Sequence, residues 1–143
     1  MSDLLTIRPI ELNEAGRVSV EDYDVLAAWW NDRGGNAPNR AMLPQCGSVA
    51  EYNGNPVAAM FMYLDGCSSG VAWLGFLATN PECNDFIRGK ALKMLVEDLS
   101  STAKELNYWL LIGHYQNESL IRLLCSSGFR VGDTGMTQLL KEL

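Results

Sequence analysis

The pattern of apolar and polar positions opens with a short strand and a helix. Residues 5–9 alternate between the two classes and stop at a proline, which predicts a first strand. A capping sequence begins at Ser19, and apolar residues behind it recur at helical spacing, so a helix is expected over 20–31. Residues 33–44 then form a long loop, and loops of this length in compact domains are usually functional or mobile.

The middle of the chain predicts an antiparallel meander followed by a long helix. Strands are expected at 47–52, 56–64 and 71–79, because turn-forming segments separate these apolar runs. One apolar stripe then predicts an amphipathic helix over 86–106. The nearly all-apolar run 108–113 predicts a central strand that is covered on both faces.

The C-terminal part predicts a further helix over 118–126 and two more strands, one starting at 129–131 and one at 136–140. A strand–helix–strand unit with a right-handed crossover places strands 71–79 and 108–113 side by side and parallel. The intervening helix then starts at the C-terminal end of the first of these strands. Free N–H groups and the helix dipole can hold a phosphate there.

Composition narrows the class of protein. A chain of 143 residues with 48% hydrophobic residues fits a single globular domain, which is expected over 1–143. Its net charge of −6 argues against nucleic acid and anionic membranes as main partners, although a local basic pocket is still allowed. No apolar run is long enough for a membrane helix, and the first residues do not have the pattern of a signal peptide.

The cysteines and the histidine predict that the protein has no metal centre and that it belongs in a reducing compartment. The four cysteines are widely spaced and form no C-x-x-C pair, and the chain has one histidine, so a zinc site is not expected. Without a secretory signal, reduced cysteines are typical of the cytoplasm, where we expect this protein.

Basic residues gather at the predicted start of helix 86–106. The segment Arg88-Gly89-Lys90-Ala91 combines two cationic side chains with a glycine that lets the backbone approach an anion. It predicts a phosphate site, and the alternative is an ordinary solvated helix start that carries basic residues.

These features resemble the GNAT superfamily of N-acetyltransferases. In that family an Arg/Gln-x-x-Gly-x-Gly/Ala signature binds the pyrophosphate of coenzyme A. Here the segment from Phe86 to Ala91 retains the Gly-x-Ala half, and Phe86 replaces the first Arg/Gln. The family's downstream pattern is matched by Asn117, Leu120, Leu123, Gly128 and Phe129. The chain also resembles a group of small GNAT proteins encoded by bacteriophages, through residues 29–34, 42–44, 56–59, 73–74, 80–81, 117–124, 128–129 and 135–140.

The resemblance implies a fold and a cofactor. The fold is α/β (α+β), a mixed, mostly antiparallel twisted sheet of about 6–7 strands flanked by about 3–4 helices. Acetyl-CoA would lie between the splayed strands of a central β-α-β unit. The end of the first strand would pair with the pantetheine arm, the basic helix start would take the pyrophosphate, and an asparagine that can also cap its helix would bind the pantetheine. The residues in these roles are Leu77, Ala78, Thr79, Arg88, Gly89, Lys90, Ala91, Asn117, Ser119 and Arg122.

The catalytic groups that the resemblance implies are partly absent. Many GNAT enzymes place a glutamate on the strand before the long helix, but residues 71–77 contain no carboxylate. Many also use a tyrosine four residues before the Gly of Gly-Phe, and that position is Leu124. We predict that His114 relays a proton and that Tyr115 protonates the thiolate. A surface histidine and a packed tyrosine are the alternatives, and Cys125 is expected to pack in the core.

The acceptor side is expected to involve Trp29, Trp30 and the loop from Arg33, with at least one tryptophan in the core. Glu51 and Tyr63 can each face the acceptor groove or point away from it. The acidic chain slightly favours a cationic acceptor.

The expected function is acetyl-CoA-dependent N-acetyl transfer to a primary amine of a small molecule or protein, in the host cytoplasm if the chain is phage-encoded. One alternative is a GNAT-fold module that binds acyl-CoA or a protein without catalysis. The other is an interaction protein that does not bind coenzyme A. Exposed strand edges near 136–140 are compatible with a homodimer.

Overall fold

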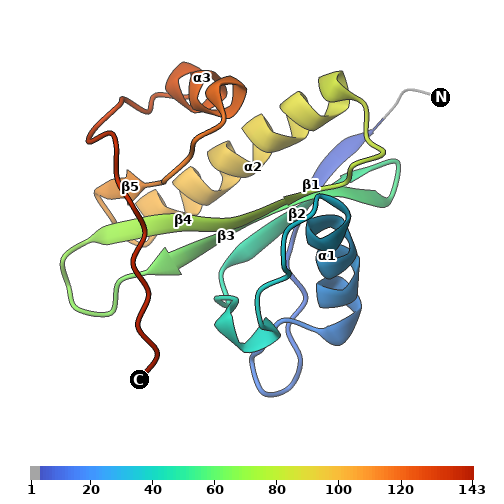
Figure 1. Ribbon diagram of the computed structural model, residues 1–143, viewed down its shortest axis with the longest axis horizontal. Coiled ribbons are helices and arrows are strands. Elements are labelled where there is room, and N and C mark those ends of the chain that lie inside the picture. The colour runs from blue at the N-terminus through green and yellow to red at the C-terminus, as the bar shows by residue number, and fades with distance from the viewer. Residues whose placement is uncertain (1–3) are drawn as a thin grey trace.

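The computed structural model describes residues 4–143 and shows one sheet with helices on both faces (Figure 1). α1 packs on one face of the sheet, and α2, with α3 beside it, packs on the other. The elements in chain order are β1 (Leu5–Pro9), α1 (Val20–Asp32), a 3-10 turn η1 (Arg40–Met42), β2 (Gly47–Tyr52), β3 (Asn55–Leu64), β4 (Val71–Thr79), α2 (Asp85–Glu105), β5 (Leu110–Ile112) and α3 (Glu118–Ser126).

The sheet follows the chain order from β1 to β5. Neighbouring strands are antiparallel up to β4, and β4 pairs with β5 in parallel through the crossover helix α2. Asn53 and Gly54 both have positive φ (51° and 83°), which is the backbone that a two-residue hairpin turn requires. The structure therefore confirms the predicted meander and the predicted β-α-β unit.

Helix starts are fixed by local capping. The Ser19 hydroxyl accepts a hydrogen bond from the Asp22 N–H at 3.1 Å, and Asn84 caps α2 by accepting from the Ile87 N–H at 2.8 Å. Because each cap satisfies a backbone donor that the helix leaves free, it sets the first helical residue. The Asn84 cap places the start of α2 at Asp85, one residue before the predicted start.

The core lies on both faces of β3. Met60, Phe61 and Met62 are all fully buried, because alternate side chains of this strand point to opposite faces and both faces are covered. Phe61 packs with Leu26 and Trp29 under α1, whereas the two methionines pack under α2. The central strand is thus β3, and the prediction of a central strand at 108–113 is wrong. β5 has only three residues, all of them half-buried.

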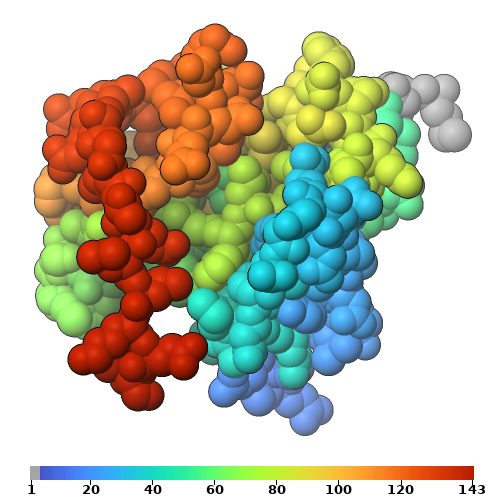
Figure 2. Space-filling model, viewed as in Figure 1, coloured from blue at the N-terminus to red at the C-terminus, as the bar shows by residue number. Residues whose placement is uncertain are grey.

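The predictions of strands at 129–131 and 136–140 are also wrong. Within the described residues the sheet has five strands, fewer than the expected 6–7, and three α-helices lie beside it, the lower of the expected 3–4. Residues 130–143, which we call the tail, make no hydrogen bond to the described part of the chain, so they contribute no strand. Their apolar side chains stay in solvent, and Leu139 is 88% exposed. In Figure 2 the end of the tail (red) stands away from the body with open space beside it.

Candidate functional site: a splayed strand pair

The two parallel strands separate soon after they meet. β4 and β5 pair only from Val71 to Trp73, opposite Leu110 to Ile112. β4 then continues to Thr79 without a strand partner on this side among the described residues, and the chain beyond Ile112 leaves the sheet. The two strands therefore diverge after Trp73 and Ile112, and we call the space beside the unpaired edge of β4 the opening, with its apex at these two residues. The predicted splayed pair is present.

A bulge distorts the unpaired half of β4. Ala59 pairs with Ala78 and Phe61 with Gly75, so Phe76 and Leu77 together oppose Met60. Phe76 has φ 50°, a left-handed conformation that is strained for an aromatic residue. The strain is confined to the segment that forms the wall of the opening, where bulges commonly redirect side chains next to functional sites.

α1 fastens this wall through two side chains. The Trp30 indole N–H donates to the Leu77 carbonyl oxygen at 2.9 Å, and the Arg33 Nε donates to the Thr79 carbonyl oxygen at 3.3 Å. Of the three residues whose backbone groups were predicted to pair with the pantetheine arm, Leu77 and Thr79 therefore already have their carbonyls engaged. Trp29 is only 8% exposed and belongs to the core, as predicted for at least one of the tryptophans. Trp30 and Arg33 hold β4 in shape.

The start of α2 carries the predicted anion-binding residues inside the helix. The Arg88 N–H donates to the Asn84 carbonyl, so from this residue on the backbone donors serve the helix. The Arg88 guanidinium folds back to the Asp85 carboxylate at 2.9 Å and to the Cys83 carbonyl at 2.6 Å. The Arg88 Nε is buried without a partner. An anion at the start of α2 would contact the backbone N–H groups of the first turn and then the side chains of the predicted anion-binding residues.

Two further features leave this helix start open to a ligand. Lys90 projects over the exposed Phe86 ring, with its Nζ 4.6 Å from the ring centroid. A Cβ added at Gly89 would meet nothing within 4 Å, so this face is clear of the protein's own atoms, and Ala91 is buried behind it. The only negatively charged side chain in the first turn of α2 is that of the exposed Asp85.

The start of α3 lies across from α2. The Asn117 side-chain oxygen accepts from the Leu120 N–H at 3.0 Å, so this residue is a helix cap. Within the described chain its side-chain amide donors have no partner. Ser119 and Arg122 are exposed on the same helix and contact each other at 3.4 Å. The cap therefore leaves this asparagine free to donate to a ligand as well.

His114 and Tyr115 project to different faces of the sheet. The exposed His114 ring stacks on Trp73 with 5.6 Å between centroids and 25° between planes. Tyr115 packs over Gly113 and toward the α2 side of the core. Its hydroxyl is buried without a hydrogen-bond partner, and burial raises the pKa of Tyr115 to about 12. The phenol therefore stays protonated at neutral pH and can donate a proton.

Leu124 and Cys125 differ in burial. Leu124, in the position of the usual family tyrosine, is buried in the core. Cys125 is an exposed free thiol on α3, so the prediction that it packs in the core is wrong. The buried face of this short helix includes Leu124. Because neighbouring residues point in different directions around a helix, Cys125 faces solvent.

Tyr63 reaches the opening, and Glu51 does not. Tyr63 lies directly opposite Trp73 in the β3–β4 register, and its hydroxyl donates to the Met42 carbonyl at 2.7 Å. Glu51 belongs to β2, two strands from β4, and pairs with Arg8 at 3.1 Å. Sequence reasoning missed Trp73 and Phe76 as neighbours of Tyr63, because only the strand register and the bulge bring the three together.

The Glu51 cluster stabilises the fold through a short ion-pair network. The Arg8 guanidinium also binds both carboxylate oxygens of Asp22, at 2.9 and 2.8 Å. Burial by itself would raise the pKa of the Asp22 carboxyl. Hydrogen bonds from Arg8 and from the Glu11 N–H outweigh it and hold this pKa below its ordinary value of 3.8.

Replacing Asp22 by asparagine should lower thermal stability at neutral pH and leave it unchanged in acid. Because the folded-state pKa is depressed, the contribution is complete above the unfolded pKa of 3.8 and disappears as pH falls through the folded value. Melting curves from neutral pH downward should show the wild type and the variant converging below about pH 4. Asp24→Asn, on the exposed side of α1, is the matched control. A gap that persists at low pH would contradict the ion-pair account.

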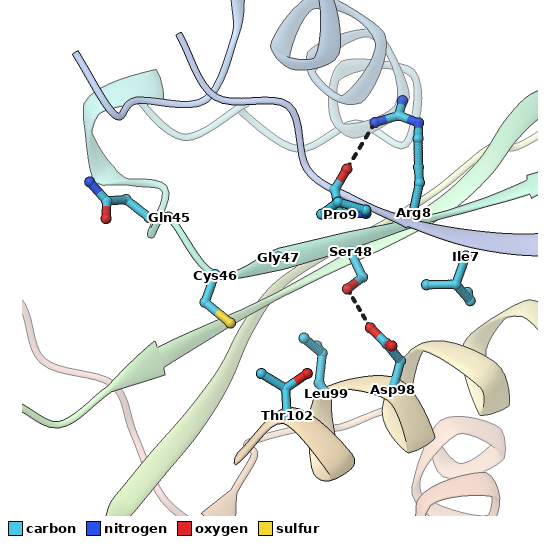
Figure 3. A pocket seen from close by; sticks show the side chains of 10 residues that line it. All are labelled: Ile7, Arg8, Pro9, Gln45, Cys46, Gly47, Ser48, Asp98, Leu99 and Thr102. Carbon is cyan, nitrogen blue, oxygen red and sulfur yellow. Dashed lines mark hydrogen bonds between the residues drawn. The ribbon is translucent and has the colours of Figure 1, made fainter. Parts of the chain in front are cut away.

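A cavity lies elsewhere, between β1, β2 and α2 (Figure 3). It has a volume of about 330 Å³, and the Ser48 hydroxyl donates to the Asp98 carboxylate inside it at 2.6 Å. Burial, together with the charge of Asp98, raises the pKa of the neighbouring Cys46 thiol. None of the residues predicted for the site lines this cavity, so it is separate from the splayed strands.

Two other classes of site are missing from the described range 4–143. No group of three or more His, Cys, Asp or Glu side chains is placed to hold a metal ion there. Over the same range, none of the helices combines the length and the apolar character that crossing a membrane requires.

Several solved structures share this fold. A protein from Thermus thermophilus has a TM-score of 0.69 at 14% identity, over 96% of this chain and 98% of its own. An aminoglycoside acetyltransferase from an uncultured soil metagenomic sample, solved with sisomicin, has a TM-score of 0.67 at 15% identity, over 96% and 97%. N-acetylglutamate synthase from Neisseria gonorrhoeae, solved with coenzyme A and N-acetyl-glutamate, has a TM-score of 0.66 at 16% identity. That match covers 91% of this chain and 29% of the synthase chain.

No model of a protein family matches the chain, and no curated protein matches its sequence. The likeness therefore lies in the backbone, and at these identities it establishes the fold alone, which this chain shares with the aminoglycoside acetyltransferase and the synthase.

Proposed function

We propose that this protein is an acetyl-CoA-dependent N-acetyltransferase that acts on a primary amine. The observation that carries the proposal is the splayed pair β4–β5, whose open edge runs between the capped starts of α2 and α3. The fold is shared with proteins that were solved with coenzyme A or with an aminoglycoside. Such an opening accepts an extended ligand arm as if it were a further strand.

Buried polar atoms without partners support a ligand in this opening. The described residues include three such atoms, and they belong to Arg88 in α2, Tyr115 after β5 and Ser127 at the end of α3. Buried polar groups are rarely left unpaired in a native protein, and a polar ligand at the start of α2 would give the Arg88 Nε a partner. The residues present thus fit coenzyme A.

The proposed binding roles run from the phosphate end to the acyl end. Lys90, with Arg88 and the open face at Gly89 and Ala91, would meet the pyrophosphate. The remaining backbone groups of the bulged β4 edge and the side-chain amide of Asn117 would bind the pantetheine arm. Ser119 and Arg122 would line the same wall. The β4 edge residues are Leu77, Ala78 and Thr79. The bound group would supply an activated acetyl thioester.

The proposed chemistry assigns the two proton transfers to the two faces of the sheet. The imidazole of His114 takes the proton that the amine nitrogen loses as the new C–N bond forms. The Tyr115 hydroxyl gives its proton to the sulfur as the C–S bond breaks. Burial raises the pKa of Tyr115 to about 12, so the phenol carries its proton at neutral pH when the C–S bond breaks.

The test is transfer of a labelled acetyl group from acetyl-CoA to a panel of amines, with the product identified by mass spectrometry. The proposal expects label on the amine nitrogen and one equivalent of free coenzyme A per product. Hydrolysis of acetyl-CoA without labelled amine would contradict it.

Reversing the charge of Lys90 should weaken coenzyme A binding about tenfold. The Lys90→Glu change places a negative charge where the pyrophosphate is expected, next to the open face of Gly89. Titration calorimetry at low salt measures the dissociation constant. Lys104→Glu, in the last turn of the same helix, is the matched control and should bind normally. Equal effects of the two changes would show general charge repulsion and contradict the assignment.

A second candidate function is an acyl-CoA-binding module without turnover. It is favoured by the absence of a carboxylate on β4 and by the buried Leu124 at the position of the usual tyrosine. Binding of coenzyme A with no labelled product from any amine would select it.

The proposal extends to assembly and source. The likeness to small phage-encoded proteins, and with it a place in the host cytoplasm, stays a prediction that the genomic surroundings of the gene can test.

A homodimer is favoured by the unpaired outer edge of β5 and the exposed apolar side chains of the tail, since both invite strand pairing.

If the tail pairs with a second copy, Leu139→Asp should shift a dimer toward monomer in light scattering after gel filtration. Leu139 is almost fully exposed within its own chain, so its replacement removes no core contact there. Lys141→Asp, two residues further along the tail, is the control for charge alone. A wild-type protein that is monomeric at every concentration would contradict the dimer.

A further inference from the structure

Two pairs of aromatic rings lie side by side on the face of the sheet that carries α1. We call them together the aromatic row, which consists of Phe76, Tyr63, Trp73 and His114. The first two rings are 6.0 Å apart between centroids, and the last two are stacked at 5.6 Å. Tyr63 and Trp73 are register partners on β3 and β4, which brings their Cβ atoms within about 4.5–5.5 Å.

The aromatic row ends at the apex of the opening. Trp73 pairs with Ile112, the last residue of β5 before the strands separate, and His114 follows two residues later. The reacting carbonyl must lie close to this apex if His114 is to take the proton of the amine. The rings therefore line the side from which an amine acceptor approaches.

The rings are held in place and remain accessible. The Tyr63 hydroxyl is fixed to the Met42 carbonyl, and burial raises the pKa of Tyr63, so this phenol stays neutral. Gly75 allows the Tyr63 ring to lie flat, because a Cβ there would come within 3.3 Å of it. Trp73 is 40% exposed and His114 is exposed as well. Large aromatic side chains with one open face offer a preformed surface for another ring.

None of the four side chains in the aromatic row is a carboxylate. A polycationic acceptor would find no ion-pair partner on this row, whatever the net charge of the whole chain. An amine that carries an aromatic ring would instead stack on Trp73 and direct its nitrogen toward His114. Because ring stacking adds to the area buried, the row discriminates between acceptors of similar size.

We propose that the acceptor is an arylalkylamine, a primary amine joined by a short chain to an aromatic ring, bound by the aromatic row. This inference rests on the proposed acetyltransferase function and narrows its substrate class. A primary alkylamine is itself a cation at neutral pH, so this class narrows the cationic acceptor that the net charge favours to one that also carries an aromatic ring.

The test compares 2-phenylethylamine with spermidine as acceptors for acetyl-CoA, in the wild type and in Trp73→Ala. The wild type should acetylate 2-phenylethylamine with a kcat/KM at least about tenfold above that for spermidine. Trp73→Ala should raise the KM for 2-phenylethylamine about tenfold and leave the stabilisation by coenzyme A unchanged. Trp109→Ala removes an exposed indole that contacts Ser69 and Gly70 at the other end of β5, and it should keep the wild-type KM.

The results of this experiment distinguish a failure of the acceptor class from a failure of the proposed acetyltransferase function. Acetylation of spermidine in preference to 2-phenylethylamine would overturn the acceptor class while leaving the acetyltransferase intact. An unchanged KM in Trp73→Ala would also overturn it. Absence of coenzyme A binding and of transfer to any amine would overturn the proposed function, and the acceptor class would fall with it.

Discussion

Replacing Tyr115 by phenylalanine should slow acetyl transfer about 10²-fold or more and, at the same time, make the free protein more stable. The two effects have one cause. The Tyr115 hydroxyl is buried without a hydrogen-bond partner, so removing it relieves a desolvated polar group and should stabilise the fold by about 1 kcal/mol. The same hydroxyl is the proposed proton donor to the thiolate. Steady-state kinetics and urea unfolding of the same preparations measure both quantities.

Tyr108→Phe is the matched control, and it should behave in the opposite way. Its hydroxyl donates to the Asp65 carbonyl at 2.7 Å, so its loss should destabilise the fold by about 0.5–1.5 kcal/mol without changing kcat. If Tyr115→Phe retains full activity, Tyr115 is a packed side chain and the catalytic assignment is wrong. A loss of stability in that variant would contradict the absence of a partner.

Truncating Phe61 to alanine should cause the largest loss of stability, about 3–5 kcal/mol. This ring is fully buried on β3, packs under α1 with Trp29, and covers Gly47 so closely that a Cβ there would come within 2.6 Å of it. The cavity left behind lies under the helix that fastens the β4 bulge. We therefore expect the truncation to weaken coenzyme A binding as well, through loss of the wall rather than of a contact.

Urea unfolding with Phe86→Ala as the control tests this prediction. Phe86 is largely exposed at the start of α2, so its removal should change the free energy of unfolding by less than about 0.5 kcal/mol. Comparable losses in the two variants would mean that the α1 face of the sheet is not the rigid core that the structure describes.

Elements with local signals could be predicted from the sequence. The capping residues Ser19 and Asn117 mark helix starts, and Asn53-Gly54 marks a hairpin, because each of these signals acts on the nearest backbone groups. The order of strands followed from the same pattern, and the meander and the parallel pair were confirmed.

Features that depend on distant partners could not be predicted. The bulge at Phe76 and the pairing of Tyr63 with Trp73 are set by strand register, which a single strand does not encode. Apolar residues such as Leu139 have strand-like surroundings in the sequence, but a strand needs a partner edge, and none is engaged within the described chain. Glu51 was placed correctly on β2, yet its distance from the opening depended on the sheet order.

The central claim is that the opening between β4 and β5 binds coenzyme A, and thermal melting with and without ligand tests it most directly. At a concentration near 100 times the dissociation constant, acetyl-CoA should stabilise the fold by about 2.7 kcal/mol. For a chain of this size that corresponds to a rise in melting temperature of roughly 5–10 °C. Free coenzyme A should give a comparable rise, and Lys90→Glu should need about tenfold more ligand to reach it. An unchanged melting temperature with both ligands would contradict the account.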